Sequence, residues 1–108
     1  MKGNNLGELE ELILLTVCAQ HPEAYGVSIR TEILTQRNIT LSTVHAVLHR
    51  LEEKGYLKSK LGEATAIRGG KRRRIFSITS YGIKILNEVR SYREQLWLSI
   101  PPTLLQKG

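Results

Sequence analysis

The sequence has few of the residues on which enzymes, secreted proteins and membrane proteins commonly depend. Its ten acidic residues are all glutamate, so neither a Ser-His-Asp arrangement nor a pair of aspartates can be assembled. The single cysteine, Cys18, cannot form an internal disulfide, and its apolar helical surroundings favour inert packing. No apolar run approaches the roughly 18 residues of a membrane span. We expect a protein that is not an enzyme and that carries no cofactor or metal.

The start of the chain also lacks a targeting signal. Residues 1–5 precede an acidic segment and not the apolar core of a signal peptide. We therefore expect a cytoplasmic protein.

The basic residues are concentrated in one segment of the chain. The 108 residues carry a formal net charge of +6, yet residues 54–74 alone carry +7, the part before them −3 and the part after them +2. A local excess of this kind indicates a polyanionic partner, either nucleic acid or an anionic membrane. The length and the content of 41% hydrophobic and 24% charged residues are typical of one globular domain.

Apolar periodicity predicts three helices before the basic segment, over residues 6–20, 25–36 and 41–54. The first is apolar around most of its circumference, with glutamates in the first turn, where the helix dipole favours negative charge. Such a helix needs cover on two sides, and in so small a protein another subunit can supply the second cover. We expect Thr40 to cap the third helix and Gly55 to end it.

After Gly55 the apolar period changes from 3.6 to 2. Residues 57–61 and 74–78 are predicted as the strands of a hairpin with a long basic tip. A final helix is expected over residues 80–99, capped by Thr79, with an apolar stripe long enough to pack on a partner helix. Two prolines close it, and residues 101–108 are expected to be a tail.

This order of elements predicts a winged helix-turn-helix fold, which is mostly α with a small two-stranded β wing (α+β). The DNA-binding domain would span residues 1–79, and residues 80–100 would add a dimerisation helix. The third helix presents small polar residues opposite its core face, which suits a reader helix in a major groove, while the wing binds adjacent phosphates or the minor groove. The residues predicted to contact DNA are Thr40, Ser42, Thr43, Ala46, His49, Arg50, Lys58, Lys60, Arg68, Lys71, Arg72, Arg73 and Arg74.

Three stretches of the sequence, residues 24–27, 39–57 and 69–79, resemble PadR-type transcriptional regulators. The most specific part is the run Gly69-Gly70-Lys71-Arg72-Arg73-Arg74 ahead of an aromatic residue and the helix start Ile78-Thr79-Ser80-Tyr81-Gly82. The resemblance covers about residues 6–97, and the short last helix fits the branch with a single C-terminal helix. It implies a homodimer formed through the first and last helices, which binds an inverted-repeat operator in double-stranded DNA, usually as a repressor. Some members respond to a phenolic or lipophilic small-molecule effector near the dimer interface.

The apolar residues of the two outer helices provide the candidates for these contacts. Tyr92 and Trp97 are the effector-binding candidates, and packing between subunits is the alternative for both. In drug-binding relatives a tryptophan on this helix lines the pocket, but about one turn earlier, near Arg93. The predicted dimer interface consists of Leu9, Leu12, Ile13, Leu86, Val89, Leu96 and Trp97.

Other readings of the same residues stay open. His45 stands where the family usually has tyrosine, and it suits packing, helix placement or a phosphate contact. His45, His49 and Glu53 have the helical spacing of metal ligands, but chance spacing is favoured because no aspartate or second cysteine completes a site. The alternative function is a winged-helix module that binds protein or RNA without an operator. A membrane-surface role lacks a basic amphipathic helix with bulky aromatics.

Overall fold

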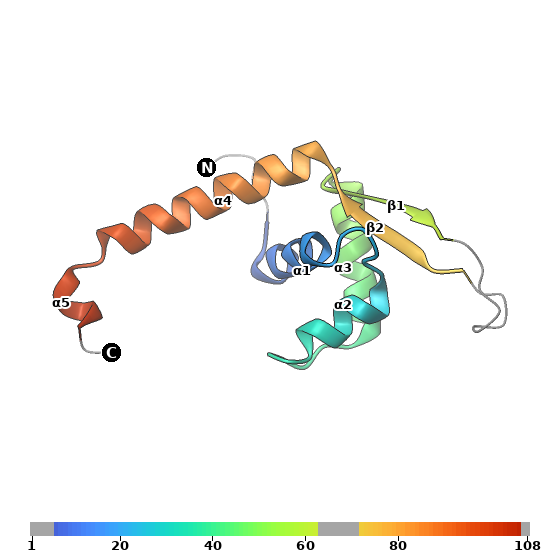
Figure 1. Cartoon of the computed structure of the whole chain (residues 1–108), viewed down its shortest axis with the longest axis horizontal. Coiled ribbons are helices and arrows are strands. Elements are labelled where there is room, and N and C mark those ends of the chain that lie inside the picture. Colours follow the sequence, from blue (N-terminus) through green and yellow to red (C-terminus); the bar gives the residue numbers. More distant parts are fainter. Residues whose placement is uncertain (1–5, 63–71, 107–108) are drawn as a thin grey trace.

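The computed structural model describes residues 6–62 and 72–106. The predicted fold class is confirmed, since helices predominate and one two-stranded sheet accompanies them (Figure 1). The elements follow in the order α1 (Glu8–Ala19), α2 (Gly26–Ile33), α3 (Leu41–Glu53), β1 (Leu57–Leu61), β2 (Arg74–Ile78), α4 (Ser80–Ser99) and α5 (Pro102–Leu105).

The largest differences from the expected elements occur at two places, and the other helix ends agree within two residues. Helix α2 ends at Ile33, three residues early, because the N–H groups of Thr35 and Gln36 donate to carbonyls three residues back, at 3.1 and 2.9 Å, in a tightened last turn. The segment expected to be a tail contains the short helix α5. The proline pair that closes α4 also begins α5, because the first turn of a helix tolerates proline.

Capping residues define the ends of α3 and the start of α4 as the sequence predicts. Thr40 Oγ1 accepts a hydrogen bond from the N–H of Thr43 at 3.1 Å. Thr79 Oγ1 accepts one from the N–H of Gly82 at 3.0 Å. Gly55, just beyond α3, has a φ of +82°, in the left-handed region that favours glycine.

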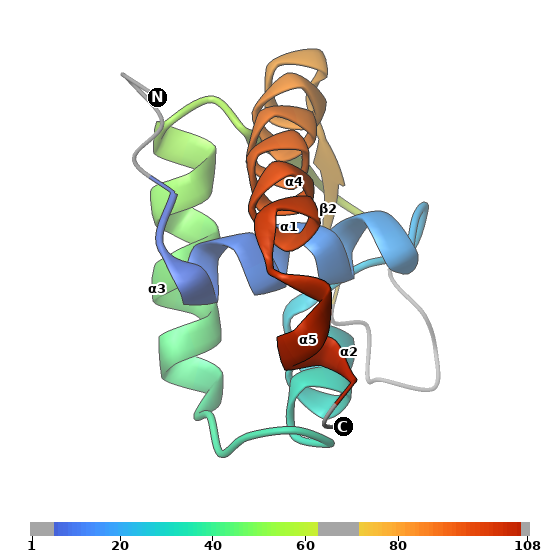
Figure 2. The same cartoon turned by 90° about the vertical axis from the view of Figure 1, so that its left-hand side faces the viewer.

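The hydrophobic core lies where the first three helices meet. Helix α1 lies across α3 (Figure 2), and the apolar stripes of both helices point inward together with that of α2. The largest fully buried side chains are Ile13, Leu14, Val17, Ile29, Val44, Val47, Leu48 and Leu51. These residues position α3 so that its opposite face is exposed.

The sheet is attached to the helices through Phe76. Strands β1 and β2 pair antiparallel, with Leu57 opposite Ile78 and Leu61 opposite Arg74. Phe76 is buried, and its N–H donates to the carbonyl of Ala24 at 2.8 Å in a bridge outside the two strands. The wing, by which we mean β1, β2 and the chain between them, is therefore joined to the segment that leads into α2.

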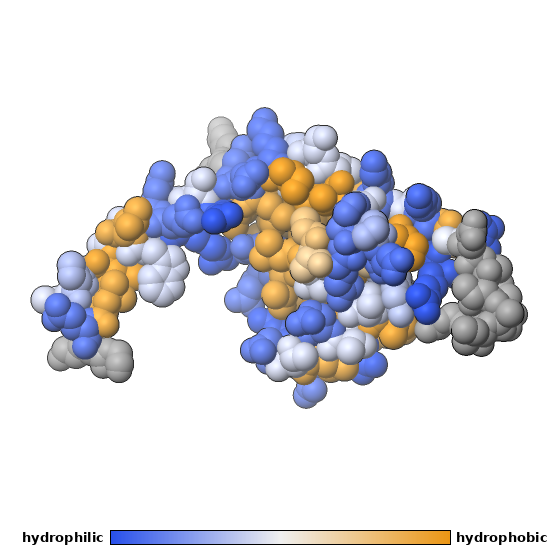
Figure 3. All heavy atoms as spheres, viewed as in Figure 1, coloured by the Kyte–Doolittle hydropathy of each residue, from blue (hydrophilic) through white to orange (hydrophobic). Residues whose placement is uncertain are grey.

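Helix α4 passes over α1 and then projects beyond the body of the molecule as an arm (Figure 1). Ile85 anchors its first half in the core, whereas every residue from position 90 to 99 is exposed. The molecule is accordingly elongated, 58 × 30 × 21 Å. Hydrophobic residues gather at the far end of the arm and on α5 (Figure 3). The exposed leucines there are Leu96, Leu98, Leu104 and Leu105.

None of the helices in the described part of the chain combines the length and the apolar character that crossing a membrane requires.

Candidate nucleic-acid interface

The exposed face of α3 carries the predicted reader residues. The side chains that the helical period places opposite the core are exposed, and they are small or polar at the start of the helix: Ser42, Thr43, Ala46, His49 and Arg50. Thr40, the capping residue, is also exposed, and its hydroxyl donates to Thr43 Oγ1 at 2.9 Å. The structure therefore brings the predicted reader residues to one side of one helix.

Glu10 of α1 holds the second half of α3. Its carboxylate, only 8% exposed, accepts hydrogen bonds from Arg50 Nε at 3.2 Å and from Lys54 Nζ at 2.9 Å. Arg50 is therefore turned toward α1 through its Nε, although about half of its side chain is exposed. Burial acts to raise the pKa of Glu10, but the hydrogen bonds from Gly7 N–H, Lys54 and Arg50 together hold this pKa below the ordinary value.

The neighbouring acids of α1 contact two other parts of the chain. Glu8 accepts a hydrogen bond at 2.9 Å from Arg37, which lies in the turn before α3. This bond and the charge of Arg37 lower the pKa of Glu8. Glu11 accepts one at 2.7 Å from Arg93 of α4, and that bond raises the pKa of Arg93. The acidic first turn of α1 thus binds a cation from the turn before α3, from α3 itself and from α4.

His45 and His49 have different surroundings on the same helix. The imidazole of His45 lies against Gly26 of α2, so closely that a β-carbon at position 26 would come within 2.9 Å of Nε2. His49 Nε2 lies 3.4 Å from a carboxylate oxygen of Glu53. Among the described residues no group of three potential metal ligands comes together. Contact with α2 is thus the environment that the structure gives His45.

The wing presents its cations in different ways. Lys58 and Lys60 are exposed on β1. The side chains of Arg72 and Arg74 are also exposed, but Arg72 Nε donates to the Gly62 carbonyl at 2.7 Å and Arg74 Nη1 to Ser59 Oγ at 3.1 Å.

Arg73 differs from its exposed neighbours. It is half-buried, and its guanidinium carbon lies 4.3 Å from the centre of the Tyr25 ring. The other two predicted wing residues, Arg68 and Lys71, lie outside the described residues.

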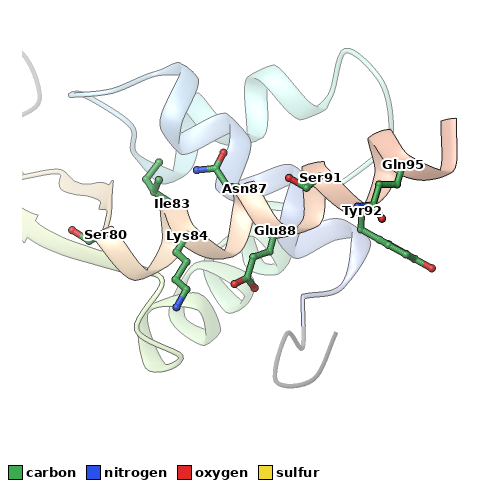
Figure 4. A pocket seen from close by; sticks show the side chains of 8 residues that line it. All are labelled: Ser80, Ile83, Lys84, Asn87, Glu88, Ser91, Tyr92 and Gln95. Carbon is green, nitrogen blue, oxygen red and sulfur yellow. The ribbon is translucent and has the colours of Figure 1, made fainter. Parts of the chain in front are cut away.

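A groove of about 580 Å³ separates α1 from α4. Trp97 is 64% exposed and lines this groove, whereas Tyr92 is 59% exposed and lines a second hollow of about 720 Å³ along another face of α4 (Figure 4). Within one chain the two predicted effector residues therefore line different hollows. The groove is lined by Glu11, Leu15, Cys18, Ile83, Leu86, Asn87, Arg90, Arg93, Glu94 and Trp97.

The predicted dimer residues divide into buried and exposed sets. Ile13 is 0% exposed within its own chain, so its prediction as an interface residue is wrong, because this side of α1 faces the chain's own core. Leu9, Leu12 and Leu86 are partly buried and pack against the core. Val89 is half-buried, and Leu96 and Trp97 are exposed on the arm.

Two exposed residues of the groove, Leu15 and Ile83, were missed as site candidates. A signal for Leu15 was present in the sequence. Residues 11, 15 and 18 follow the spacing of a second helical stripe, separate from the one that enters the core.

Comparison with known proteins confirms the resemblance seen in the sequence. The model of the PadR-like family of transcriptional regulators matches residues 14–88. No curated protein of assigned function matches the chain.

Solved structures agree with the fold. A PadR family transcriptional regulator from Eggerthella lenta DSM 2243 is 24% identical, with 94% of this chain and 88% of that chain covered and a TM-score of 0.67. A PadR-like transcriptional regulator from Bacillus cereus ATCC 14579 is 20% identical, with 93% and 92% covered and a TM-score of 0.70. A transcriptional regulator from Clostridium thermocellum is 28% identical over 82% of this chain and 84% of its own, with a TM-score of 0.65.

Proposed function

Because the chain belongs to the PadR-like family of transcriptional regulators, which are DNA-binding proteins, we propose that it is a sequence-specific repressor. It acts in the cytoplasm as a homodimer on an inverted-repeat operator in double-stranded DNA. The observation that carries this proposal is the exposed, small and polar face of α3 next to a wing with exposed cations.

The start of α3 suits base contacts in a major groove. Ser42 and Ala46 are small enough to let the helix approach the base edges, and His49 extends the same face by one turn. Lys58, Lys60 and the exposed arginines Arg72 and Arg74 bind phosphates, which fix the orientation of the helix on the duplex.

The arm supports assembly with a second copy. Its far end exposes large apolar side chains, among them Leu98, which is 87% exposed. Large apolar side chains that gather at an exposed end of a molecule are typical of an interaction site. Pairing through the arm would place two reader helices in successive major grooves, about 34 Å apart, as in helix-turn-helix dimers.

The groove between α1 and α4 suits a small lipophilic or phenolic effector. It combines apolar walls from Leu15, Leu86 and Trp97 with the polar ends of Arg90 and Arg93 at its rim. The dimer can hold its two reader helices at different spacings. A ligand in the groove would change operator affinity if it binds more tightly to one of these spacings than to another.

The first experiment selects the DNA sequence that the protein prefers. The full chain is incubated with a library of random double-stranded DNA, and the enriched duplex is measured by fluorescence anisotropy against single-stranded RNA of equal length. We expect enrichment of an inverted repeat, affinity that falls steeply with salt, and weak RNA binding. Equal binding of RNA, or no enriched repeat, would contradict the proposal.

The second experiment tests the dimer and the groove. Sedimentation equilibrium at micromolar concentration should give twice the mass of the chain, and a monomer would contradict the dimer.

Trp97 is the only tryptophan, so its fluorescence reports directly on the groove. We expect quenching by 4-hydroxycinnamic acid or by a planar lipophilic dye, with Tyr92→Phe as the matched variant on the other face of α4. The absence of quenching by both probes would contradict the effector site.

A further inference from the structure

The consecutive arginines of the wing do not share one environment. Arg72 and Arg74 are exposed, whereas Arg73 between them is half-buried. The Nε atom of Arg73 is shielded from solvent and has no hydrogen-bond partner among the described residues. A guanidinium nitrogen that has lost its water without gaining a hydrogen bond needs another source of stabilisation.

The ring of Tyr25 supplies that stabilisation. The guanidinium carbon of Arg73 lies 4.3 Å from the ring centre, within the range of a cation–π contact. Arginine suits this arrangement because its planar group stacks on aromatic faces and is weakly hydrated.

The backbone explains why these two side chains meet. Ala24 pairs antiparallel with Phe76, so Tyr25 comes next to position 75 of β2. The N–H of Gly62 donates to the carbonyl of Arg73, which extends the pairing of the two strands by one position, to residue 73. Arg73 is then a diagonal neighbour of Tyr25, within reach of a long side chain.

This contact joins the two DNA-facing parts of the molecule. Tyr25 immediately precedes α2 as its capping residue, and α2 packs on the reader helix α3. Arg73 lies just before β2, at the end of the paired strands that is away from their junctions with α3 and α4. The stacked pair therefore restrains the direction of the wing relative to the helix-turn-helix.

We propose that Arg73 is a positioning residue that orients the wing through Tyr25 and does not itself bind phosphate. The inference rests on the proposed function, since it assigns a role within DNA binding. It divides the basic run into Arg72 and Arg74, which face solvent and are available to DNA, and Arg73, which is committed to the fold.

The salt dependence of binding distinguishes the two roles. Each phosphate contact contributes about 0.9 to the slope of log K against log salt on B-DNA. With the selected duplex, Arg72→Gln should lower this slope by about 1 per subunit, and therefore by about 2 for the dimer. Arg73→Gln should weaken binding about tenfold with a smaller change in slope. Tyr25→Leu, which removes no charge, should weaken binding to a similar extent, and Tyr25→Phe should retain wild-type binding.

The double variant tests the pairing directly. If the residues act through each other, Arg73→Gln combined with Tyr25→Leu should be no weaker than the weaker single variant. A slope lowered by Arg73→Gln as much as by Arg72→Gln, together with normal binding by Tyr25→Leu, would show a phosphate ligand and overturn the proposal.

A measurement without DNA separates this inference from the proposed function. In hydrogen exchange of the free chain, Arg73→Gln and Tyr25→Leu should both accelerate the amide of Phe76, while Arg72→Gln and Tyr25→Phe should not. Unchanged exchange in both disruptive variants would overturn the positioning role even if DNA binds. If the two disruptive variants accelerate exchange at Phe76 but the wild-type chain binds no duplex, the contact between Arg73 and Tyr25 is supported and the DNA-binding function is overturned.

Discussion

Glu10 and Lys54 lie 44 positions apart in the sequence and form an ion pair, with Lys54 Nζ 2.9 Å from Glu10 Oε2. The same carboxylate accepts hydrogen bonds from Gly7 N–H, at the start of its own helix, and from Arg50 of α3. One buried glutamate thus stabilises the start of α1 and attaches the end of the reader helix to it. Because Glu11 of the same turn contacts Arg93, α1 also connects the reader helix to the arm.

Replacing Glu10 by glutamine should destabilise the fold by about 1–2 kcal/mol, because charge-assisted hydrogen bonds are lost at a nearly buried site while both cations keep access to water. Urea unfolding followed by circular dichroism would measure the change. Glu94→Gln is the matched control, since its partner Arg90 and Glu94 itself are both exposed. An equal loss in the two variants would contradict the special role of Glu10.

The stability of the fold should fall as the solution is acidified, in part through Glu10. Its pKa is lowered in the folded chain, so the folded state binds the proton more weakly than the unfolded state and acid favours unfolding. The contribution is fully present above the unfolded pKa of about 4.3 and is lost as the pH falls through the lower folded value. When the unfolding midpoint is measured between about pH 7 and about pH 3, it should therefore fall less steeply with decreasing pH for Glu10→Gln than for wild type. An equally steep fall in the two proteins would refute the contribution of Glu10 to the acid sensitivity.

A negative charge at the centre of the reader face should weaken duplex binding strongly with little effect on the stability of the fold. Ala46 is exposed on α3, so Ala46→Glu should change the unfolding free energy by no more than about 0.5 kcal/mol. Repulsion from DNA should lower affinity for the selected duplex more than tenfold. Ala19→Glu, at the exposed last residue of α1 and outside α3, the wing and the arm, is the same substitution and should bind normally. Equal losses in both variants would indicate a general charge effect and not a reader position.

Local patterns in the sequence were sufficient to predict most of the fold. The caps at Thr40 and Thr79, the left-handed Gly55 and the change of period after it depend on interactions within a few residues. The outward face of α3 follows from the same helical period that buries Val44 and Leu51. Elements and reader face were therefore predictable from one sequence.

Contacts between distant segments could not be predicted in the same way. A helical wheel gives no partner to Glu10, whose cations come from 40 and 44 positions away. Arg73 has the same charge as its neighbours, and only the bridge between residues 24 and 76 brings it onto Tyr25. Ile13 was assigned to a dimer because α1 has two apolar sides, and sequence alone did not indicate which side the chain covers itself.

The contact between His45 and Gly26 should make the effects of substitutions at these two positions on the free energy of unfolding non-additive. A β-carbon at position 26 would lie 2.9 Å from Nε2 and 3.3 Å from Nδ1 of His45, so Gly26→Ala displaces the imidazole. Because a side chain moves aside more easily than backbone, we expect Gly26→Ala to lower the free energy of unfolding by only about 1 kcal/mol. In a His45→Ala background the same substitution should cost at least about 0.5 kcal/mol less. Additive losses in urea unfolding would show that the imidazole does not occupy this space in solution.

The start of α4 should tolerate no side chain at Gly82. A β-carbon there would collide with the backbone carbonyl of Tyr56 and lie 2.7 Å from Cγ1 of Ile78, and a carbonyl at the start of a strand cannot move aside as a side chain can. Helix propensity alone makes Gly→Ala in a helix stabilising by roughly 0.5–1 kcal/mol, so the sign of the effect is diagnostic. We expect Gly82→Ala to destabilise by about 2 kcal/mol or more, because α4 must shift away from the sheet. Calorimetry would measure this as a lower Tm, and a raised Tm would show that α4 is not seated on Tyr56 as described.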